Sequence, residues 1–276
     1  MSLKKDISDF ITRNSGYIVI IVIIYMVTTL IVIAKPHGFS VPEITTSYDL
    51  FGVSLVGFIL LLIIGGYLLY RYFTKARPLE QAPFQLIWGS SFLVYSITML
   101  GLLLQAWGFG FADMTDPLIF LIWRTPMILW VAGMWIGVTK LMTDCPKCTY
   151  LAALLIFLVG EIWFFIGLVL LDDIELTMYG FLYWEFVPMA FILALLWYHY
   201  GKGAGLNSPK VITIGFTLFG IAYLAWAPWH FEELKYVWYV WFHIYLVALA
   251  ILLTGFYALP KEILGEFREP QSDSTE

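Results

Sequence analysis

Residues 117–142 read PLIFLIWRTPMILWVAGMWIGVTKLM, and this stretch decides the fold class. It is long enough to cross the hydrocarbon core of a bilayer, which takes about 20 mostly apolar residues in a helix. Arg124 and, near the end, Lys140 are its only charged residues. A lipid-exposed backbone must satisfy its own hydrogen bonds, and the alternating pattern of a barrel strand is absent. The stretch therefore predicts a membrane-spanning helix.

Similar apolar runs fill most of the chain. Of its 276 residues, 61% are hydrophobic and only 13% are charged, whereas a soluble domain carries about 25% charged residues. No polar stretch is long enough to build a soluble core. The sequence predicts an all-α, polytopic integral membrane helical bundle with eight transmembrane helices, at Tyr17–Ala34, Phe51–Tyr72, Phe84–Trp107, Pro117–Met142, Tyr150–Leu171, Met178–Tyr200, Val211–Ala227 and Val237–Leu259.

The lysine and arginine residues predict the orientation of this bundle. Of the 15 in the chain, twelve fall in segments that are inside if the N-terminus is cytoplasmic, two fall in the other loops, and Arg124 lies in a helix. Cytoplasmic loops carry the excess of positive charge, so we expect both termini to be cytoplasmic (N-in/C-in) in a multi-pass protein of the cell membrane. The domains are then a cytoplasmic N-terminal segment (1–16), the eight-helix transmembrane domain (17–259) and a cytoplasmic polar tail (260–276).

The chain shows a weak internal repeat. Phe51-Gly52 and Tyr70-Arg71-Tyr72 bracket the second predicted span. Tyr179-Gly180 and Tyr198-His199-Tyr200 bracket the sixth with the same internal spacing. A 4+4 parallel repeat, related by an axis along the membrane normal, is one interpretation. The other is that apolar helices align with almost any other apolar helix.

Four ionisable residues lie deep in the predicted spans, where such residues are costly and tend to be functional. At about 1.5 Å per helical residue, Arg124, Glu185 and His243 fall at similar depth in the outer half of the bundle, and Glu161 lies nearer the midplane. We expect Arg124 to form an ion pair with Glu185. One interpretation is that this ion pair is purely structural and only fixes the packing of the helices. The functional interpretation is a ligand or proton site in which the two carboxyl groups and the imidazole exchange protons.

Aromatic residues surround this layer of charges. Trp123, Trp184 and Trp241 neighbour the charged positions and complete the predicted ligand- or proton-binding set. An apolar pocket with a few polar groups suits a planar ligand such as a quinone. Packing of aromatics in a bundle core and the interfacial belt of tryptophan and tyrosine are the simpler explanations.

The two cysteines of the chain, Cys145 and Cys148, have the spacing of a redox or metal motif. A zinc site needs two more ligands, and no nearby His or Cys supplies them. We therefore predict no metal site and expect two free thiols in a short cytoplasmic loop. The net charge of −5 comes without a basic patch, so no nucleic-acid partner is expected.

The order of the last seven spans resembles that of seven-helix sensors and microbial rhodopsins, and Thr125-Pro126 resembles the Thr-Pro of a rhodopsin third helix. That resemblance implies retinal on a lysine, but Val237–Leu259 contains no lysine, so retinal in Schiff-base form is excluded. The number of spans is also similar to that of quinone-reactive anchor subunits of the polysulfide-reductase type, which lack haem. No two histidines fall at matching depth on facing spans, so haem is not expected here either.

The first functional hypothesis is an integral membrane subunit that binds a quinone-like or other lipophilic ligand in the outer half of the bundle. It would act in electron transport. Because no cofactor motif is present, the redox step would belong to a partner, and we expect other membrane or peripheral protein subunits to be partners of the chain in addition to the lipid bilayer. The alternatives are a small-solute or proton transporter that uses the same buried charges, and a seven-helix-type membrane sensor without retinal. No motif assigns an enzymatic activity.

Overall fold

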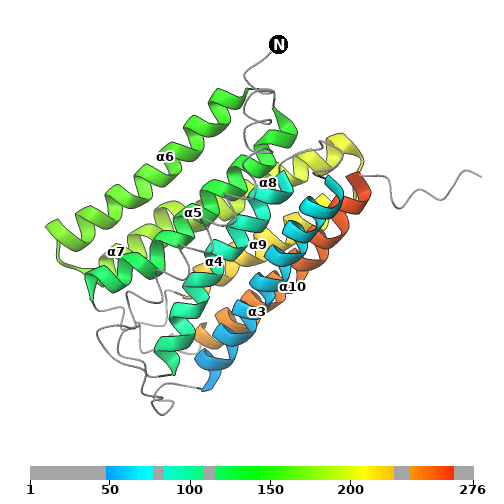
Figure 1. The fold of residues 1–276 in the computed structure, drawn as a ribbon. Helices are drawn as coiled ribbons and strands as arrows, with labels where there is room; N and C mark the ends of the chain where they lie inside the picture. Colours follow the sequence, from blue (N-terminus) through cyan, green and yellow to red (C-terminus); the bar gives the residue numbers. More distant parts are fainter. Residues whose placement is uncertain (1–47, 77–83, 108–115, 144, 227–236, 264–276) are drawn as a thin grey trace, which may run out of the picture.

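Every described element of the chain is a helix (Figure 1). The computed structural model describes residues 48–76, 84–107, 116–143, 145–226 and 237–263. Segments labelled η are short π-helical turns. In chain order the elements are α3 (Tyr48–Arg71), η1 (Tyr72–Ala76), α4 (Phe84–Ala106), α5 (Pro117–Met142), α6 (Pro146–Phe165), η3 (Ile166–Leu170), α7 (Ile174–Phe181), η4 (Leu182–Phe186), α8 (Val187–Ala204), α9 (Ser208–Trp226) and α10 (Val237–Ile263).

The helices have the length and composition of membrane spans. Within the described residues, six are long and apolar enough to cross a membrane, and the apolar helix at Ser208–Leu224 is shorter. The prediction of a helical chain suited to a membrane is confirmed, and helices occupy the positions of the last seven predicted spans. The predicted span Tyr17–Ala34, the segment 1–16 and residues 264–276 lie outside the described residues. The six helices that are long and apolar enough to cross a membrane are Phe51–Lys75, Phe84–Ala106, Pro117–Met142, Pro146–Leu170, Leu176–Ala204 and His243–Ile263.

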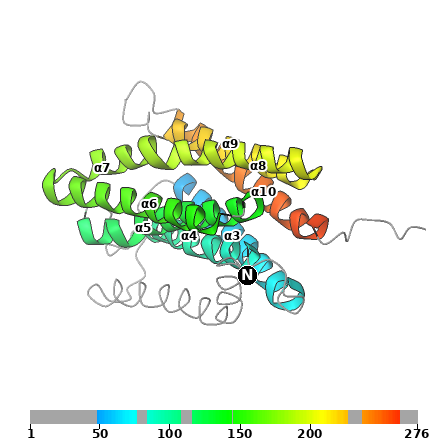
Figure 2. The same cartoon turned by 90° about the horizontal axis from the view of Figure 1, so that it is seen from above.

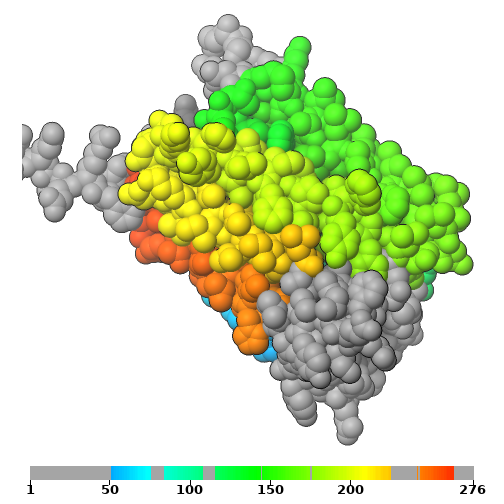
Figure 3. Space-filling view, turned by 180° about the vertical axis from the view of Figure 1, so that it is seen from behind, coloured from blue at the N-terminus to red at the C-terminus, as the bar shows by residue number. Residues whose placement is uncertain are grey.

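Six helices of the described part, a set that includes the shorter α9 and leaves out α6, form a closed ring. Successive neighbours are α3, α4, α5, α8, α9 and α10, and α10 packs back against α3. Helix α6 lies outside the ring, against α5 and α7, at the edge of the bundle farthest from α3 and α10 (Figure 1). Seen from above, α7, η4 and α8 run as one nearly continuous helix along one side (Figure 2). On the opposite face from Figure 1, α8, α9 and α10 lie side by side (Figure 3).

Local sequence signals set several helix ends. Asp116 caps α5, where its carboxylate accepts hydrogen bonds from the backbone N–H groups of Leu118 (2.9 Å) and Ile119 (3.1 Å). Pro117 follows at the first helical position, where its missing N–H costs nothing. Helix α8 ends at Gly205, whose φ of 67° is the left-handed conformation that glycine adopts without strain.

Glycine lets some helices approach very closely. A Cβ atom on Gly65 of α3 would lie 2.9 Å from the carbonyl oxygen of Gly89 on α4. On α5, a Cβ atom at Gly137 would lie within 1.8 Å of the indole nitrogen of Trp88. Small residues at such contacts are the usual basis of helix association in membranes, where there is no hydrophobic driving force between helices.

Aromatic side chains fill the interior of the ring. The indole of Trp130 on α5 stacks on Tyr95 of α4 with ring centroids 4.9 Å apart, and it also contacts Phe219 of α9 at 5.1 Å. Phe186 and Tyr223 meet edge to face at 4.8 Å. These contacts join α4, α5, η4 and α9 around one core, so the buried polar groups described next lie among aromatic rings.

Candidate functional site

Arg124 lies on the side of α5 that faces the ring interior. The residue is only 6% exposed. Its guanidinium interacts electrostatically with the phenol groups of Tyr223 and Tyr95, and one terminal nitrogen lies 3.8 Å from the sulfur of Met127. Its Nε atom is buried without a hydrogen-bond partner, and Arg124 forms no ion pair within the described part of the chain. The cation is therefore surrounded by hydroxyl groups and aromatic rings.

Three tyrosines from three helices form the polar centre of the ring. The hydroxyl oxygens of Tyr95 and Tyr223 are 2.5 Å apart, and Tyr245 on α10 donates a hydrogen bond to Tyr95 at 3.5 Å. Trp241 stacks on Tyr245 with ring centroids 5.3 Å apart. We call Arg124 with Tyr95, Tyr223 and Tyr245 the arginine–tyrosine cluster.

A pair of carboxyl groups lies on the other side of α5. Glu185, on η4, is 7% exposed, and Glu161, on α6, is half-buried. The two groups interact electrostatically, and the hydroxyl of Thr125 on α5 donates a hydrogen bond to Glu161. One carboxyl oxygen of each glutamate is buried and has no hydrogen-bond partner. We call Glu161 and Glu185 the acid pair.

The local geometry explains how Glu185 reaches this position. A Cβ atom on Gly160 would lie 2.9 Å from Oε2 of Glu185, so the missing side chain of Gly160 leaves the space for the carboxyl group. Glu185 belongs to a π-helical turn, and such turns occur often at functional sites. Trp163 holds α6 against α7 through a hydrogen bond from its indole N–H to the carbonyl of Thr177 (2.8 Å).

The structure does not bring Arg124, Glu185 and His243 into the single cluster that the depths suggest. Arg124 faces the tyrosines, Glu185 faces Glu161, and no interaction found for either of them involves the other or His243. His243 is exposed on α10. The physical reason is that α5 separates the two polar groups: Arg124 and Thr125 are adjacent in sequence and therefore point about 100° apart around the helix.

The three predicted tryptophans also separate. Trp123 is fully buried where α5 meets α4, and its ring occupies the space left by Gly101, where a Cβ atom would lie 2.4 Å away. Trp241 is buried beside the arginine–tyrosine cluster. Trp184 is 86% exposed and points out of the bundle. The predicted set thus divides between the ring interior, the acid pair and the outer surface.

Tyr95, Tyr223 and Thr125 were missed as polar groups of the site. The first two are aromatic residues in apolar runs, and the sequence does not show which groups their hydroxyls meet. The one available signal is that a buried tyrosine hydroxyl usually finds a hydrogen-bond partner. Thr125 precedes Pro126, a pattern that also occurs in spans without a site.

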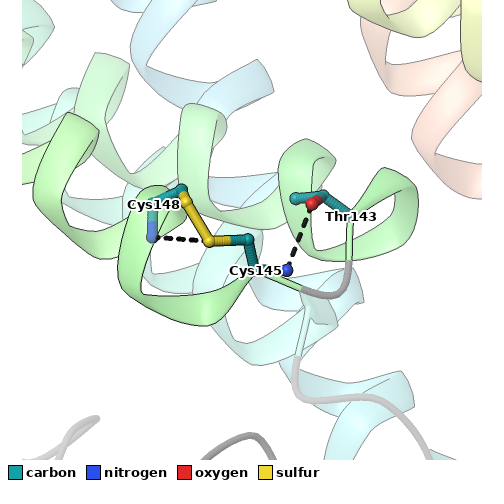
Figure 4. Close-up of a disulfide and its surroundings, with 3 residues drawn as sticks. All are labelled: Thr143, Cys145 and Cys148. Carbon is teal, nitrogen blue, oxygen red and sulfur yellow. Dashed lines mark hydrogen bonds between the residues drawn. A yellow bond between two sulfur atoms is a disulfide. The ribbon is translucent and has the colours of Figure 1, made fainter.

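The expectation of two free thiols is wrong as well. Cys145 and Cys148 form a disulfide at the N-terminus of α6 (Figure 4). Cysteines separated by two residues at a helix N-terminus are close enough to pair, with Cα atoms 5.3 Å apart. No group of three or more His, Cys, Asp and Glu residues that would hold a metal occurs in the described ranges.

Comparisons of the chain with protein-family models, curated proteins and solved structures gave no match. Within the described residues, the features that point to a function are the arginine–tyrosine cluster, the acid pair and the disulfide.

Proposed function

We propose that the chain is an integral membrane subunit that binds a quinone-like or other lipophilic ligand at the acid pair. The observation that supports this most is the buried, unpartnered oxygen on each of Glu161 and Glu185. A buried polar atom without a hydrogen bond is rare and costs about 1–3 kcal/mol. A ligand with carbonyl or hydroxyl groups would supply the missing hydrogen bonds.

The surroundings of the acid pair suit a ligand that comes from the lipid. Glu161 lies on α6, which packs against α5 and α7 outside the ring and exposes a long apolar face. Trp184 and Tyr183, on the same π turn as Glu185, are exposed and provide flat apolar surface. A planar ring could lie against these side chains while its oxygen atoms meet the carboxyl groups.

The acid pair also provides the proton chemistry that a quinone needs. Oxidation of a quinol releases two electrons and two protons. Carboxyl groups that share an apolar site commonly hold a proton between them and exchange it. In the proposal the acid pair takes up the protons, and the electrons pass to a redox group on an associated subunit, because no cofactor motif occurs in this chain.

The proposed subunit has the membrane arrangement that the sequence predicts. The chain would cross the cell membrane eight times, with both termini cytoplasmic, as the lysine and arginine distribution indicates. The 4+4 repeat remains an interpretation of the spacing in the sequence. Arg124 would stabilise the ring interior beside the site through its tyrosine neighbours, and it would not contact the ligand.

Binding is tested with the whole chain in lipid nanodiscs, titrated with a short-chain ubiquinone and a menaquinone analogue, with tryptophan fluorescence as the readout. Glu161→Leu and Glu185→Leu remove the hydrogen bonds and should each weaken binding about tenfold or more. Glu161→Gln and Glu185→Gln keep groups that hydrogen-bond, so they should keep most of the affinity.

Glu262→Gln is the matched control, since that carboxylate binds Ser208 at the far end of the bundle. It should leave the affinity unchanged. Leucine variants that bind either quinone as tightly as the original chain would refute the site. A chain that binds neither quinone saturably would refute the ligand class.

Proton transport is the second candidate, and the position of α5 favours it. This helix carries Thr125 toward the acid pair and Arg124 toward the tyrosines, so polar groups flank it on both sides. Liposomes that contain the chain and a pH-sensitive dye test this. Transport predicts a proton flux that Glu185→Gln reduces at least tenfold, and ligand binding alone predicts no flux.

A further inference from the structure

The disulfide between Cys145 and Cys148 stands at the start of α6, apart from both polar groups described above. Cys145 is the N-cap residue of α6, and Cys148 lies in its first turn. The backbone N–H of Cys148 donates a hydrogen bond to Sγ of Cys145 at 3.3 Å. The N–H of Cys145 donates to the hydroxyl of Thr143 at 3.1 Å (Figure 4).

The position of this disulfide argues against a purely structural role. The two cysteines are three positions apart in sequence. The stabilisation that a disulfide provides grows with the length of the loop that it closes, so a bridge this short contributes least. It also joins no distant parts, because α5 and α6 are already linked by a connection of three residues.

Its surroundings favour reaction with thiols. Cys148 is exposed and Cys145 is half-buried, so an incoming thiolate has better access to the sulfur of Cys148. Thiolates are stabilised at helix N-termini and beside cations. Lys147, an exposed cation, lies between the two cysteines in the sequence.

We propose that Cys145 and Cys148 form a thiol–disulfide exchange site whose substrate is a protein dithiol. This function goes beyond ligand binding at the acid pair and does not depend on it. On the predicted orientation the loop is cytoplasmic, where disulfides are rare and those present are usually catalytic or redox-sensing.

The reaction balances without a further reagent. A thiolate of the partner attacks Sγ of Cys148, the bond between the two sulfurs of this chain breaks, and Cys145 leaves as a thiolate. The N–H of Cys148, already hydrogen-bonded to that sulfur, stabilises the leaving group. The partner's second thiol then attacks the mixed disulfide. The partner ends as a disulfide, this chain ends as a dithiol, and two electrons and two protons have moved to this chain.

The chain contains only these two cysteines, so the products can be assigned without ambiguity. The whole protein in nanodiscs is first alkylated under denaturing conditions, and the proposal expects no label on either cysteine. The folded protein is then treated with N-acetylcysteine and quenched with N-ethylmaleimide. Peptide mass spectrometry should find N-acetylcysteine on Cys148 and the maleimide on Cys145.

A synthetic peptide with a Cys-X-X-Cys dithiol serves as the substrate in a second experiment. The folded chain should oxidise it, and an excess of the oxidised peptide should restore the disulfide of the chain. Cys145→Ser, treated with the disulfide of N-acetylcysteine, should keep N-acetylcysteine on Cys148, because no second thiol remains in this chain to displace it. Cys148→Ser should react at least tenfold more slowly, because Cys145 is less accessible.

The effect of the nearby positive charge on the exchange rate is tested with lysine variants. Lys147→Ala should slow the exchange about two- to fivefold, the size of a single charge effect at a helix terminus. Lys202→Ala, an exposed lysine on α8, is the matched control and should not slow it. Three results would each overturn the proposal. The first is that both thiols are reduced and the oxidised peptide does not oxidise them, and the second is that N-acetylcysteine attaches to Cys145. The third is a disulfide that reacts only after the protein is unfolded.

Discussion

Replacing Tyr95 by phenylalanine removes the hydroxyl group to which two other tyrosines are hydrogen-bonded. The oxygen of Tyr223 is 2.5 Å away and that of Tyr245 is 3.5 Å away, at the limit of a hydrogen bond. An unpaired buried hydroxyl costs about 1–3 kcal/mol, and hydrogen bonds between membrane helices average about 0.6 kcal/mol and reach about 1.7 kcal/mol. We therefore expect the free energy of unfolding to fall by about 1–2 kcal/mol for Tyr95→Phe or Tyr223→Phe. For Tyr245→Phe we expect a fall of about 0.5 kcal/mol or less.

A double-mutant cycle separates the hydrogen bond from the packing of the rings. In the variant with both Tyr95→Phe and Tyr223→Phe, neither hydroxyl remains to be left unpaired. Its loss of stability should be smaller than the sum of the two single losses by about 1 kcal/mol. The measurement is equilibrium unfolding in bicelles, followed by tryptophan fluorescence.

Two results would refute this account of the ring interior. One is additivity of Tyr95→Phe and Tyr223→Phe, which would mean that their hydroxyl groups do not interact. The other is a larger loss for Tyr245→Phe than for Tyr223→Phe, which would reverse the order expected from the two distances.

Two further substitutions test other parts of the structure. Gly160→Ala would place a methyl group 2.9 Å from Oε2 of Glu185, so it should destabilise the protein by about 1–3 kcal/mol and weaken quinone binding. Gly66→Ala, with nothing within 4 Å, is its control, and equal effects on thermal unfolding would contradict the close contact. Glu262→Gln should lower stability by about 1 kcal/mol, because its carboxylate accepts a hydrogen bond from the backbone N–H of Ser208 at 3.0 Å. An unchanged unfolding temperature would show that this bond does not stabilise the start of α9.

The sequence predicted the helices well because the bilayer sets a strong rule. A span needs a long apolar run, and such runs are visible at Phe84–Trp107 and Pro117–Met142. Helices occupy 84–106 and 117–142 in the structure. The prediction of the span Met178–Tyr200 does not include the π turn that the structure has at 182–186. Hydrophobicity does not distinguish a π turn from the α-helix around it.

The site was harder to predict because depth in the membrane does not give direction around a helix. Arg124 and Glu185 were placed at similar depth, but one faces the tyrosines and the other faces Glu161. Direction depends on which helices are neighbours, and the closed ring with α6 outside it cannot be read from apolar runs that resemble one another. The disulfide was missed for a different reason: the spacing of Cys145 and Cys148 permits both free thiols and a bridge.

The π turn at Leu182–Phe186 has a consequence for the length of the chain. An i→i+5 turn contains one residue more than the i→i+4 turn of an α-helix. A π turn and an α turn each close about one full circuit of the helix, so deleting the exposed Trp184 would restore a regular helix and leave the residues before and after it facing nearly the same directions. The backbone carbonyl of Thr177 that binds Trp163 and the ring of Phe186 that packs on Tyr223 would then still meet their partners. Deleting one residue from the regular part of α8 would instead rotate the flanking segments by about 100°, so a deletion in the π turn should be tolerated better.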